Sequence, residues 1–232
     1  MTRLLINVEG ETEETFVNEV LAPHLYTHGY VTVGARLIGN ARLRERRGGI
    51  RSWSSVRADI VRQLRADAAV ITTTMVDYYG LPRTGDKAWP GRDLAANLPF
   101  PQKAPCVETA LRNDLNTVMR HDFNPRRFIP FVIMHEFEGL LFSDCSAFSR
   151  GIYRPELKAD FQAIRDEFQT PEEIDDSPIT APSKRVLNII PNYQKPILGT
   201  LAAAEIGLVA IRAECPHFSD WLNQLEQAAE PR

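Results

Sequence analysis

The chain of 232 residues has an ordinary globular composition, with 44% hydrophobic residues, 25% charged residues and a formal net charge of −3. This composition argues against global disorder and gives no overall signal for nucleic-acid binding. No run approaches the roughly 18 apolar residues of a membrane span and no signal peptide is expected, which predicts a cytoplasmic protein without a membrane partner. Three widely spaced cysteines, Cys106, Cys145 and Cys215, are expected to be free thiols.

The first third of the chain alternates between strand-like and helix-like segments. The predicted elements are a strand at 4–8, a helix at 12–28 with Thr12 as its N-cap, a strand at 30–38, a helix after Ser52 or Ser54, and a strand at 68–76 ending at Asp77. This βαβαβ order implies a parallel sheet with right-handed crossovers. Ligands of such sheets gather at the carboxyl ends of the strands, where both Glu9 and Asp77 are expected.

The rest of the chain is predicted to be mostly helical. Residues 78–105 are rich in Pro and Gly and predict a long loop, which is uncommon in a compact domain unless it is functional. The later predicted elements are a helix at 107–120, a strand at 128–134 that turns into a helix through Phe142, and helices at 155–168, 183–190, 196–212 and 218–228. We therefore expect an α/β core over residues 1–150 and a helical C-terminal extension over residues 151–232 packed on it.

Carboxylates follow three of the predicted strands. Glu9 and Glu13 flank the first strand-to-helix turn, and Asp77 ends the third strand. Hard divalent cations prefer oxygen ligands of this kind. Two simpler interpretations remain open: Glu11, Glu13 and Glu14 complement a helix dipole, and Asp77 forms a turn.

The segment His135-Glu136-Phe137-Glu138 supplies two more acids after the fourth strand. It lacks the second histidine of a zinc protease motif. One of its two glutamates is expected to face the site while the other caps the helix, and Glu136 is preferred for the site because it is nearer the strand end.

Several cations are candidates for contacts with an anionic partner. Lys184 and Arg185 fall in the first turn of a predicted helix, where cations are unfavourable unless an anion or a nearby acid balances them. His217 is expected to be structural. The segment 36–65 holds nine arginines and two acids, which is typical either of a solvated surface or of phosphate contact.

With these residues in view, the chain resembles Toprim-like proteins, and more closely the family catalogued as domain of unknown function 4276. The matching segments span nearly the whole chain and are Val8-Glu9-Gly10-Glu11-Thr12-Glu13, Met75-Val76-Asp77-Tyr78-Tyr79-Gly80-Leu81-Pro82, His135-Glu136-Phe137-Glu138-Gly139-Leu140-Leu141-Phe142-Ser143-Asp144, Ala181-Pro182-Ser183-Lys184-Arg185 and Cys215-Pro216-His217-Phe218. The resemblance extends to the Toprim domains of overcoming-lysogenization-defect nucleases, in which strand-end acids bind magnesium for phosphodiester chemistry.

The resemblance implies roles for individual residues. Glu9 matches the first-motif glutamate, Glu13 the second acid of the nuclease branch, and Asp77 the aspartate of the second motif. The usual Asp-x-Asp pair is absent because position 79 is Tyr, and the resemblance suggests Glu136 or Glu138 as the replacement ligand. Lys184, helped by Arg185, matches the phosphate-side lysine.

These observations predict a nuclease that uses Mg²⁺ or Mn²⁺ and acts on DNA in preference to RNA. The resemblance also implies a place in a bacterial phage-defence system and an ATPase partner. The alternative is a non-catalytic Toprim-like subunit that docks onto that ATPase, and a phosphate-ester hydrolase acting on nucleotides is a third class. The oligomeric state is left open.

Overall fold

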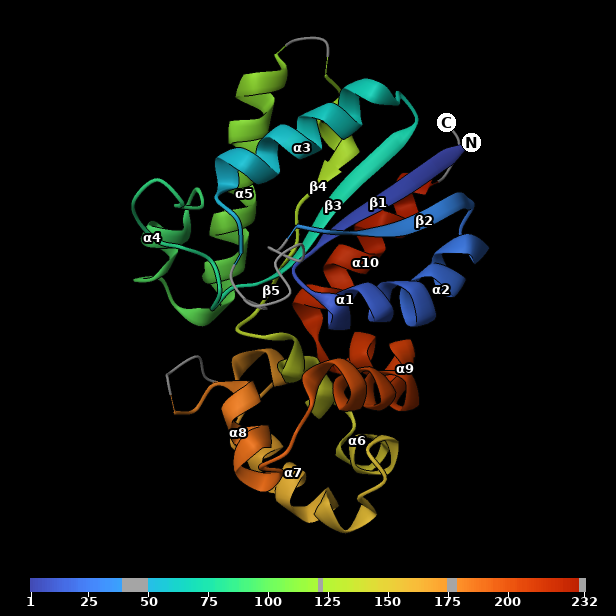
Figure 1. Ribbon diagram of the computed structural model, residues 1–232, viewed down its shortest axis with the longest axis vertical. Coiled ribbons are helices and arrows are strands. Elements are labelled where there is room, and N and C mark those ends of the chain that lie inside the picture. Colours follow the sequence, from blue (N-terminus) through green and yellow to red (C-terminus); the bar gives the residue numbers. More distant parts are fainter. Residues whose placement is uncertain (39–49, 121–122, 175–178, 230–232) are drawn as a thin grey trace.

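A parallel β-sheet forms the centre of the computed structural model, which describes residues 1–38, 50–120, 123–174 and 179–229 (Figure 1). Its strands are β1 (Thr2–Val8), β2 (Tyr30–Leu37), β3 (Val70–Asp77), β4 (Phe128–Ile129) and β5 (Val132–Ile133). The strand order is β2-β1-β3-β4, and β5 pairs with the last two residues of β3. The predicted α/β fold with a parallel sheet and a helical C-terminal part is confirmed.

The fourth strand differs from its prediction. It was expected to be continuous over 128–134, but Pro130 and Phe131 separate β4 from β5. Proline has no N–H to donate to a neighbouring strand, so the ladder breaks there. The Phe131 N–H and carbonyl bond instead to the hydroxyl of Thr74, at 3.0 Å and 2.9 Å. The two short strands therefore still follow β3 to its carboxyl end.

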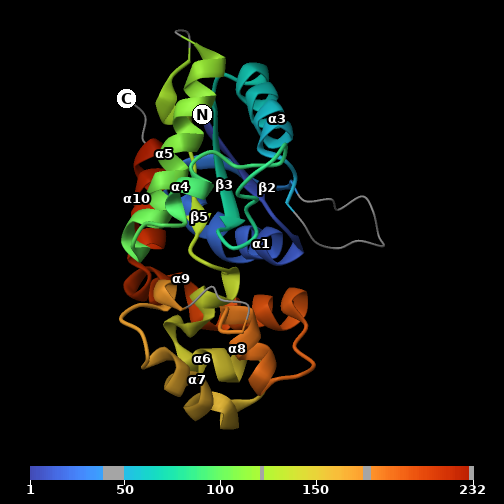
Figure 2. The same cartoon turned by 90° about the vertical axis from the view of Figure 1, so that its left-hand side faces the viewer.

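Helices cover both faces of the sheet (Figures 1 and 2). One face packs against α1 (Glu11–Phe16), the π-helical turn η1 (Val17–Leu21), α2 (Ala22–Thr27) and α10 (Pro216–Ala229). The other face packs against α3 (Trp53–Ala66) and α5 (Phe100–Met119). All eight residues of β3 are buried, which explains why this strand reads as a continuous apolar and threonine-rich run.

Two helix starts also differ from the predictions. The first helix begins at Glu11 with Gly10 as its N-cap, so Thr12 lies inside the helix. The segment 78–105 was expected to be a loop, but it contains α4 (Arg92–Ala95) and the first turns of α5, which begins at Phe100 and includes Pro105. Pro101 fits the first turn of a helix, where its missing N–H has no intrahelical partner to lose.

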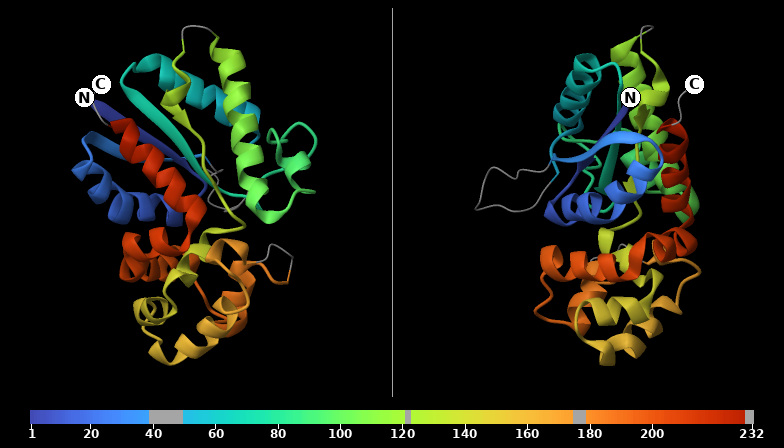
Figure 3. Two further views of the ribbon diagram at one scale, coloured as in Figure 1. Left: turned by 180° about the vertical axis from the view of Figure 1, so that it is seen from behind. Right: turned by 90° about the vertical axis from the view of Figure 1, so that its right-hand side faces the viewer.

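A second group of helices lies beyond the carboxyl ends of the strands, below the sheet in Figure 1 and in both views of Figure 3. It comprises η3 (Phe137–Ser143), α6 (Cys145–Gly151), η4 (Pro155–Leu157), α7 (Lys158–Arg165), η5 (Pro171–Glu173), α8 (Pro182–Ile189), η6 (Lys195–Gly199) and α9 (Thr200–Glu214). Its apolar residues share one core with the α1 face of the sheet. After α9 the chain returns to the sheet as α10, where the Trp221 indole N–H bonds to the Thr73 hydroxyl at 2.9 Å.

One described segment, Lys195–Glu214, is long and apolar enough by composition to cross a membrane, with a hydropathy of 1.5. By length and composition, the expectation that no run approaches the roughly 18 apolar residues of a membrane span is therefore wrong. In the structure the segment is not one straight helix, because the backbone leaves the helical conformation at Gly207 (φ 74°, ψ 160°). Lys195 at its start contacts acidic side chains.

Candidate functional site

The topology of the sheet places its switch point between β1 and β3. The connection from β1 to β2 crosses one face of the sheet, and the connection from β2 to β3 crosses the other. The chain therefore leaves β1 toward one edge of the sheet and leaves β3 toward the other edge. Ligands of open parallel sheets bind at this point, outside the carboxyl ends. Glu9 directly follows β1, and Asp77 is the last residue of β3.

Glu9 and Asp77 meet through the backbone. The Asp77 N–H donates to Glu9 Oε2 at 3.3 Å, and Asp77 Oδ1 accepts the N–H of Phe137 at 2.9 Å. Gly80 makes room for this arrangement, because a Cβ atom there would lie 3.2 Å from Glu9 Oε1. The ends of two strands and the start of η3 are thereby tied together.

Glu13 and Glu138 bring buried carboxylates to the same place. Glu13 is 2% exposed, and one of its oxygens accepts the Gly10 N–H at 3.0 Å. Glu138, in η3, is 1% exposed. Glu136 was preferred over Glu138 for the site, but its Oε2 accepts the Ser183 N–H at the start of α8 at 2.8 Å. The structure therefore reverses the expected order: Glu138 faces the other acids and Glu136 caps a helix beside them.

Lys195 lies at the centre of these acids, and the sequence analysis did not identify it. Its Nζ is 3.4 Å from Glu13 Oε1, 3.3 Å from Asp77 Oδ2 and 3.2 Å from Glu138 Oε2. The lysine side chain is 32% exposed, against 3%, 11% and 1% for the side chains of Glu13, Asp77 and Glu138 that it contacts. We call Glu9, Glu13, Asp77, Glu138 and Lys195 the acidic site.

Burial and mutual repulsion shift the pKa values of the acidic site. Burial, with the charge of Glu13, raises the pKa of Glu9 to about 6. Burial also raises the pKa of Glu138, and it raises that of Asp77 well above its usual value, while Lys195 opposes both shifts. Burial alone would lower the pKa of Lys195, but Asp77, Glu138 and Glu13 together hold it well above its usual value. The site thus holds more negative charge than one ammonium neutralises.

The donor atoms of the acidic site fit a hard divalent cation. Glu13 Oε1 and Glu138 Oε2 are buried and contact Lys195 Nζ at 3.4 Å and 3.2 Å, whereas the buried Glu138 Oε1 has no hydrogen-bond partner among the described residues. Buried polar atoms in native proteins nearly always have a partner, so such atoms point to a ligand. The donors are all carboxylate oxygens, which Mg²⁺ and Mn²⁺ prefer.

The comparison with known families agrees with the matching segments of the sequence. A family model described as domain of unknown function (DUF4276) matches residues 8–226. The chain belongs to the DUF4276 family. No curated protein and no solved structure matches it.

Lys184 and Arg185 are the two cations that were expected at the site of this DUF4276 protein, and their surroundings differ from those of Lys195. Lys184 is exposed on the first turn of α8. Arg185 donates to the Thr180 carbonyl at 3.0 Å, forms an ion pair with Glu167 at 2.9 Å and lies over the Phe168 ring. Arg185 therefore has the neighbouring acid that the structural interpretation required.

The arginine-rich segment of the DUF4276 chain falls partly outside the described residues, which exclude Arg42, Arg44, Arg46 and Arg47. Four of its other arginines already contact acids within the chain. Asp59 lies 2.8 Å from Arg51, 2.7 Å from Arg62 and 4.0 Å from Arg36, and Arg57 pairs with Asp114 at 2.9 Å. These four arginines are part of the fold, which weakens the argument that they track a polyanion.

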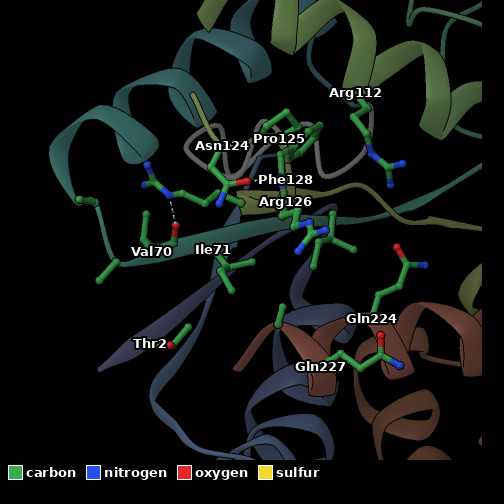
Figure 4. A pocket seen from close by; sticks show the side chains of 15 residues that line it. Thr2, Val70, Ile71, Arg112, Asn124, Pro125, Arg126, Phe128, Gln224 and Gln227 are labelled. Carbon is green, nitrogen blue, oxygen red and sulfur yellow. Dashed lines mark hydrogen bonds between the residues drawn. The ribbon is translucent and has the colours of Figure 1, made fainter. Parts of the chain in front are cut away.

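The DUF4276 chain also has a hollow at the opposite end of the sheet (Figure 4). Thr2, Val70, Ile71 and Phe128, at the amino ends of their strands, line it together with Arg112, Arg126, Gln224 and Gln227. None of the acids of the acidic site reaches it. This hollow and the convergent acids are therefore separate features.

Proposed function

We propose that this protein is a divalent-cation-dependent phosphodiesterase that cleaves nucleic acid, with the acidic site as its catalytic centre. The observation that carries the proposal is the convergence of Glu9, Glu13, Asp77 and Glu138 at the switch point, where four carboxyl groups gather around one ammonium and Glu138 Oε1 has no hydrogen-bond partner among the described residues. A relation to Toprim nucleases is part of the same proposal, supported by the strand-end positions of Glu9 and Asp77.

The acids would take different roles according to where they lie in the acidic site. Glu9, Asp77 and Glu138 face Lys195 or each other and would hold Mg²⁺ or Mn²⁺, with Glu13 as a further ligand through Oε1 once that oxygen is released by Lys195. Asp77 is oriented by the Phe137 N–H, and Glu13 by the Gly10 N–H, so each keeps one oxygen for a ligand. A bound divalent cation supplies activation of water and neutralisation of the phosphate oxygens.

Lys195 would change partners in this reaction. A divalent cation and an ammonium repel each other, so entry of the cation weakens the ion pairs of Lys195 with Asp77 and Glu138. Its side chain is 32% exposed, and it would turn toward the open side, where an anionic substrate arrives. There it would stabilise negative charge developing on the phosphate. Lys195 therefore replaces Lys184 in our proposal as the phosphate-side lysine.

A second candidate function rests on the same lysine. Its ammonium already contacts three carboxylates, which makes the site self-consistent without any metal. A non-catalytic Toprim-like subunit that docks onto a partner ATPase would need no more than this. The ATPase partner and the place in phage defence rest on the family resemblance alone.

Cleavage assays with site variants test the proposal. Supercoiled, linear and single-stranded DNA and RNA are incubated with wild-type protein in Mg²⁺, in Mn²⁺ and in chelator, alone and with the genomically neighbouring ATPase. We expect metal-dependent cleavage, with DNA preferred. Glu9→Gln should reduce the rate by about 100-fold or more, beyond the loss typical of outer-shell groups of metal sites.

Glu11→Gln is the matched control for the charge change. Glu11 is exposed in the same first turn of α1, so it shares the helix dipole but not the buried cluster. Its variant should cleave like the wild type. Cleavage that survives Glu9→Gln would overturn the assigned site, and absence of cleavage under every condition would favour the docking subunit. Binding of the nucleic acid should weaken steeply with salt.

A further inference from the structure

Three potential metal ligands gather away from the acidic site, on the helices that cover the α1 face of the sheet. His24 lies on α2, His28 is the C-cap residue of α2, and Glu226 lies on α10. One ligand atom from each lies within 4.8 Å of the other two. The side chains of His24, His28 and Glu226 are 28%, 35% and 14% exposed, so the cluster opens to solvent on one side.

The distances are close to those of a tetrahedral site. His24 Nε2 is 2.7 Å from Glu226 Oε1, and His28 Nε2 is 3.9 Å from the same oxygen. Ligand bonds of about 2.0–2.1 Å at tetrahedral angles place neighbouring ligand atoms about 3.3 Å apart. The two observed separations lie on either side of this value. The third separation, between the ligand atoms of His24 and His28, is within 4.8 Å, so shifts of up to about 1.5 Å would seat an ion.

The hydrogen bonds around His28 hold its ring in the form that binds metal. His28 Nδ1 lies 3.1 Å from the carbonyl oxygen of His24. A carbonyl can only accept, so in the neutral imidazole Nδ1 carries the proton and the lone pair is on Nε2, which faces Glu226. This backbone contact is typical of metal-bound histidines. The position at the end of α2 also favours a cation, because helix C-termini carry partial negative charge.

Glu226 stays available as an anionic ligand. Two neighbouring side chains, Arg212 and His24, contact its carboxylate. Arg212 donates to both carboxylate oxygens, at 2.6 Å to Oε1 and 2.9 Å to Oε2. An ion that takes Oε1 leaves the Oε2 bond in place, so Arg212 would orient the carboxylate from behind.

We propose that His24, His28 and Glu226 form a second metal site, specific for a transition metal ion such as Zn²⁺, that ties α2 to α10. Two imidazole nitrogens and one carboxylate oxygen suit Zn²⁺ or Co²⁺ and disfavour Mg²⁺. The solvent-facing side leaves a fourth position for water. The site is independent of the proposed function, because none of its residues belongs to the acidic site.

Titration of the chelator-treated, dialysed protein tests the proposal. Zn²⁺ binding is followed by calorimetry and Co²⁺ binding by visible absorption, both at neutral pH in excess Mg²⁺, which competes for carboxylates but poorly for imidazole. We expect one equivalent of either ion, a tetrahedral Co²⁺ spectrum without a thiolate charge-transfer band, and a higher melting temperature with Zn²⁺. Failure of the wild type to bind one equivalent would overturn the proposal.

Histidine variants assign the ligands. His28→Gln and His24→Gln should each weaken Zn²⁺ binding by at least about tenfold and remove the Zn²⁺-dependent rise in melting temperature. His28 is the more exposed of the two, so its variant should fold normally, which circular dichroism verifies. His217→Gln is the matched control, since His217 pairs with Glu108 elsewhere, and it should bind normally. Unchanged Zn²⁺ binding in both His24→Gln and His28→Gln would contradict the site.

Discussion

The buried acids of this protein form two groups, which differ in the hydrogen-bond partners of their carboxylate oxygens. Glu172 is 4% exposed, and its two oxygens accept the N–H groups of His217 and Phe218 at 2.9 Å each, at the start of α10. Glu138 is 1% exposed; its Oε2 contacts only the Lys195 ammonium, at 3.2 Å, and its Oε1 has no hydrogen-bond partner among the described residues. A buried carboxylate whose two oxygens both accept backbone N–H groups supports structure, whereas one with an unpartnered oxygen is available to a ligand.

Glu108 belongs with the satisfied group. Its Oε1 accepts the Val132 N–H at 2.9 Å and lies 2.8 Å from His217 Nε2. We call Glu108, Glu172 and His217 the structural network. It joins α5, β5, η5 and α10, whereas the acidic site has one lysine, Lys195, as its shared cation. Removing charges from the two groups should therefore have different consequences.

The largest expected effect is the loss of the shared cation. In the absence of divalent ions, Lys195→Gln should destabilise the protein by about 3 kcal/mol, the lower end for breaking a buried ion pair because the lysine is partly exposed. The loss should shrink as the pH falls and the carboxylates become protonated, and saturating Mg²⁺ should restore much of the stability. Urea unfolding measures the change.

Lys184→Gln is the control for Lys195→Gln, because Lys184 is an exposed lysine on α8. Its free energy of unfolding should stay within about 0.5 kcal/mol of the wild type. A Lys195→Gln protein as stable as the wild type at neutral pH, without metal, would show that the acids need no shared cation.

The second prediction concerns the structural network. Glu172→Ala removes the acceptor of two backbone N–H groups and should cost about 2–3 kcal/mol in the free energy of unfolding. Mg²⁺ should not recover this loss, in contrast to Lys195→Gln. Glu172→Gln keeps one carbonyl oxygen and should cost less. Equal recovery by Mg²⁺ in both proteins would remove the distinction between the two groups.

Much of the acidic site follows from local sequence patterns. Apolar runs end at Glu9 and Asp77, and the βαβαβ order forces both ends to one edge of the sheet. The choice between Glu136 and Glu138 does not follow, because it depends on how the chain turns after β5. His135 has a positive φ of 64° there, a conformation that is uncommon for any residue other than glycine, although histidine adopts it more often than most.

Lys195 was missed for a different reason. It reaches Asp77 across 118 residues of sequence, and the segment Asn192-Tyr193-Gln194-Lys195 resembles the ordinary approach to a helix. Contacts of this separation depend on how the helical layer docks against the sheet, which no local pattern specifies. The helix predicted at 107–120 begins earlier, at Phe100; its first turns were assigned to a loop because they contain two prolines, which indicate a loop when the sequence is read locally.

The third prediction uses the pKa of Glu9. Its folded value of about 6 lies above the ordinary 4.5, so the folded protein binds more protons between these values. The contribution of Glu9 to the free energy of unfolding should therefore fall as the pH rises from about 4.5 to 6, and it should stay low above that range. Glu9→Gln should therefore stabilise the metal-free protein by about 1–2 kcal/mol at pH 7 and leave it unchanged near pH 4. Denaturant unfolding at both pH values tests this.

The smallest effect on the free energy of unfolding should come from His217. Its pKa is raised because a partner favours the charged form, whereas the pKa of Glu9 is raised because burial disfavours the charged form. Burial lowers the pKa of His217, but the hydrogen bond and charge of Glu108 outweigh burial and raise it. The protonated form is therefore favoured in the folded state, so its contribution should be complete below the unfolded pKa of about 6.5 and lost as the pH rises through the higher folded value. His217→Gln should flatten this part of the profile of unfolding free energy against pH.

A profile that keeps the same fall in the variant would assign the titration to another group. A wild-type profile that rises with pH would mean that burial outweighs Glu108. Because Glu9 titrates near 6 and His217 above its usual value, the two slopes separate on the pH axis, and each variant should remove one of them.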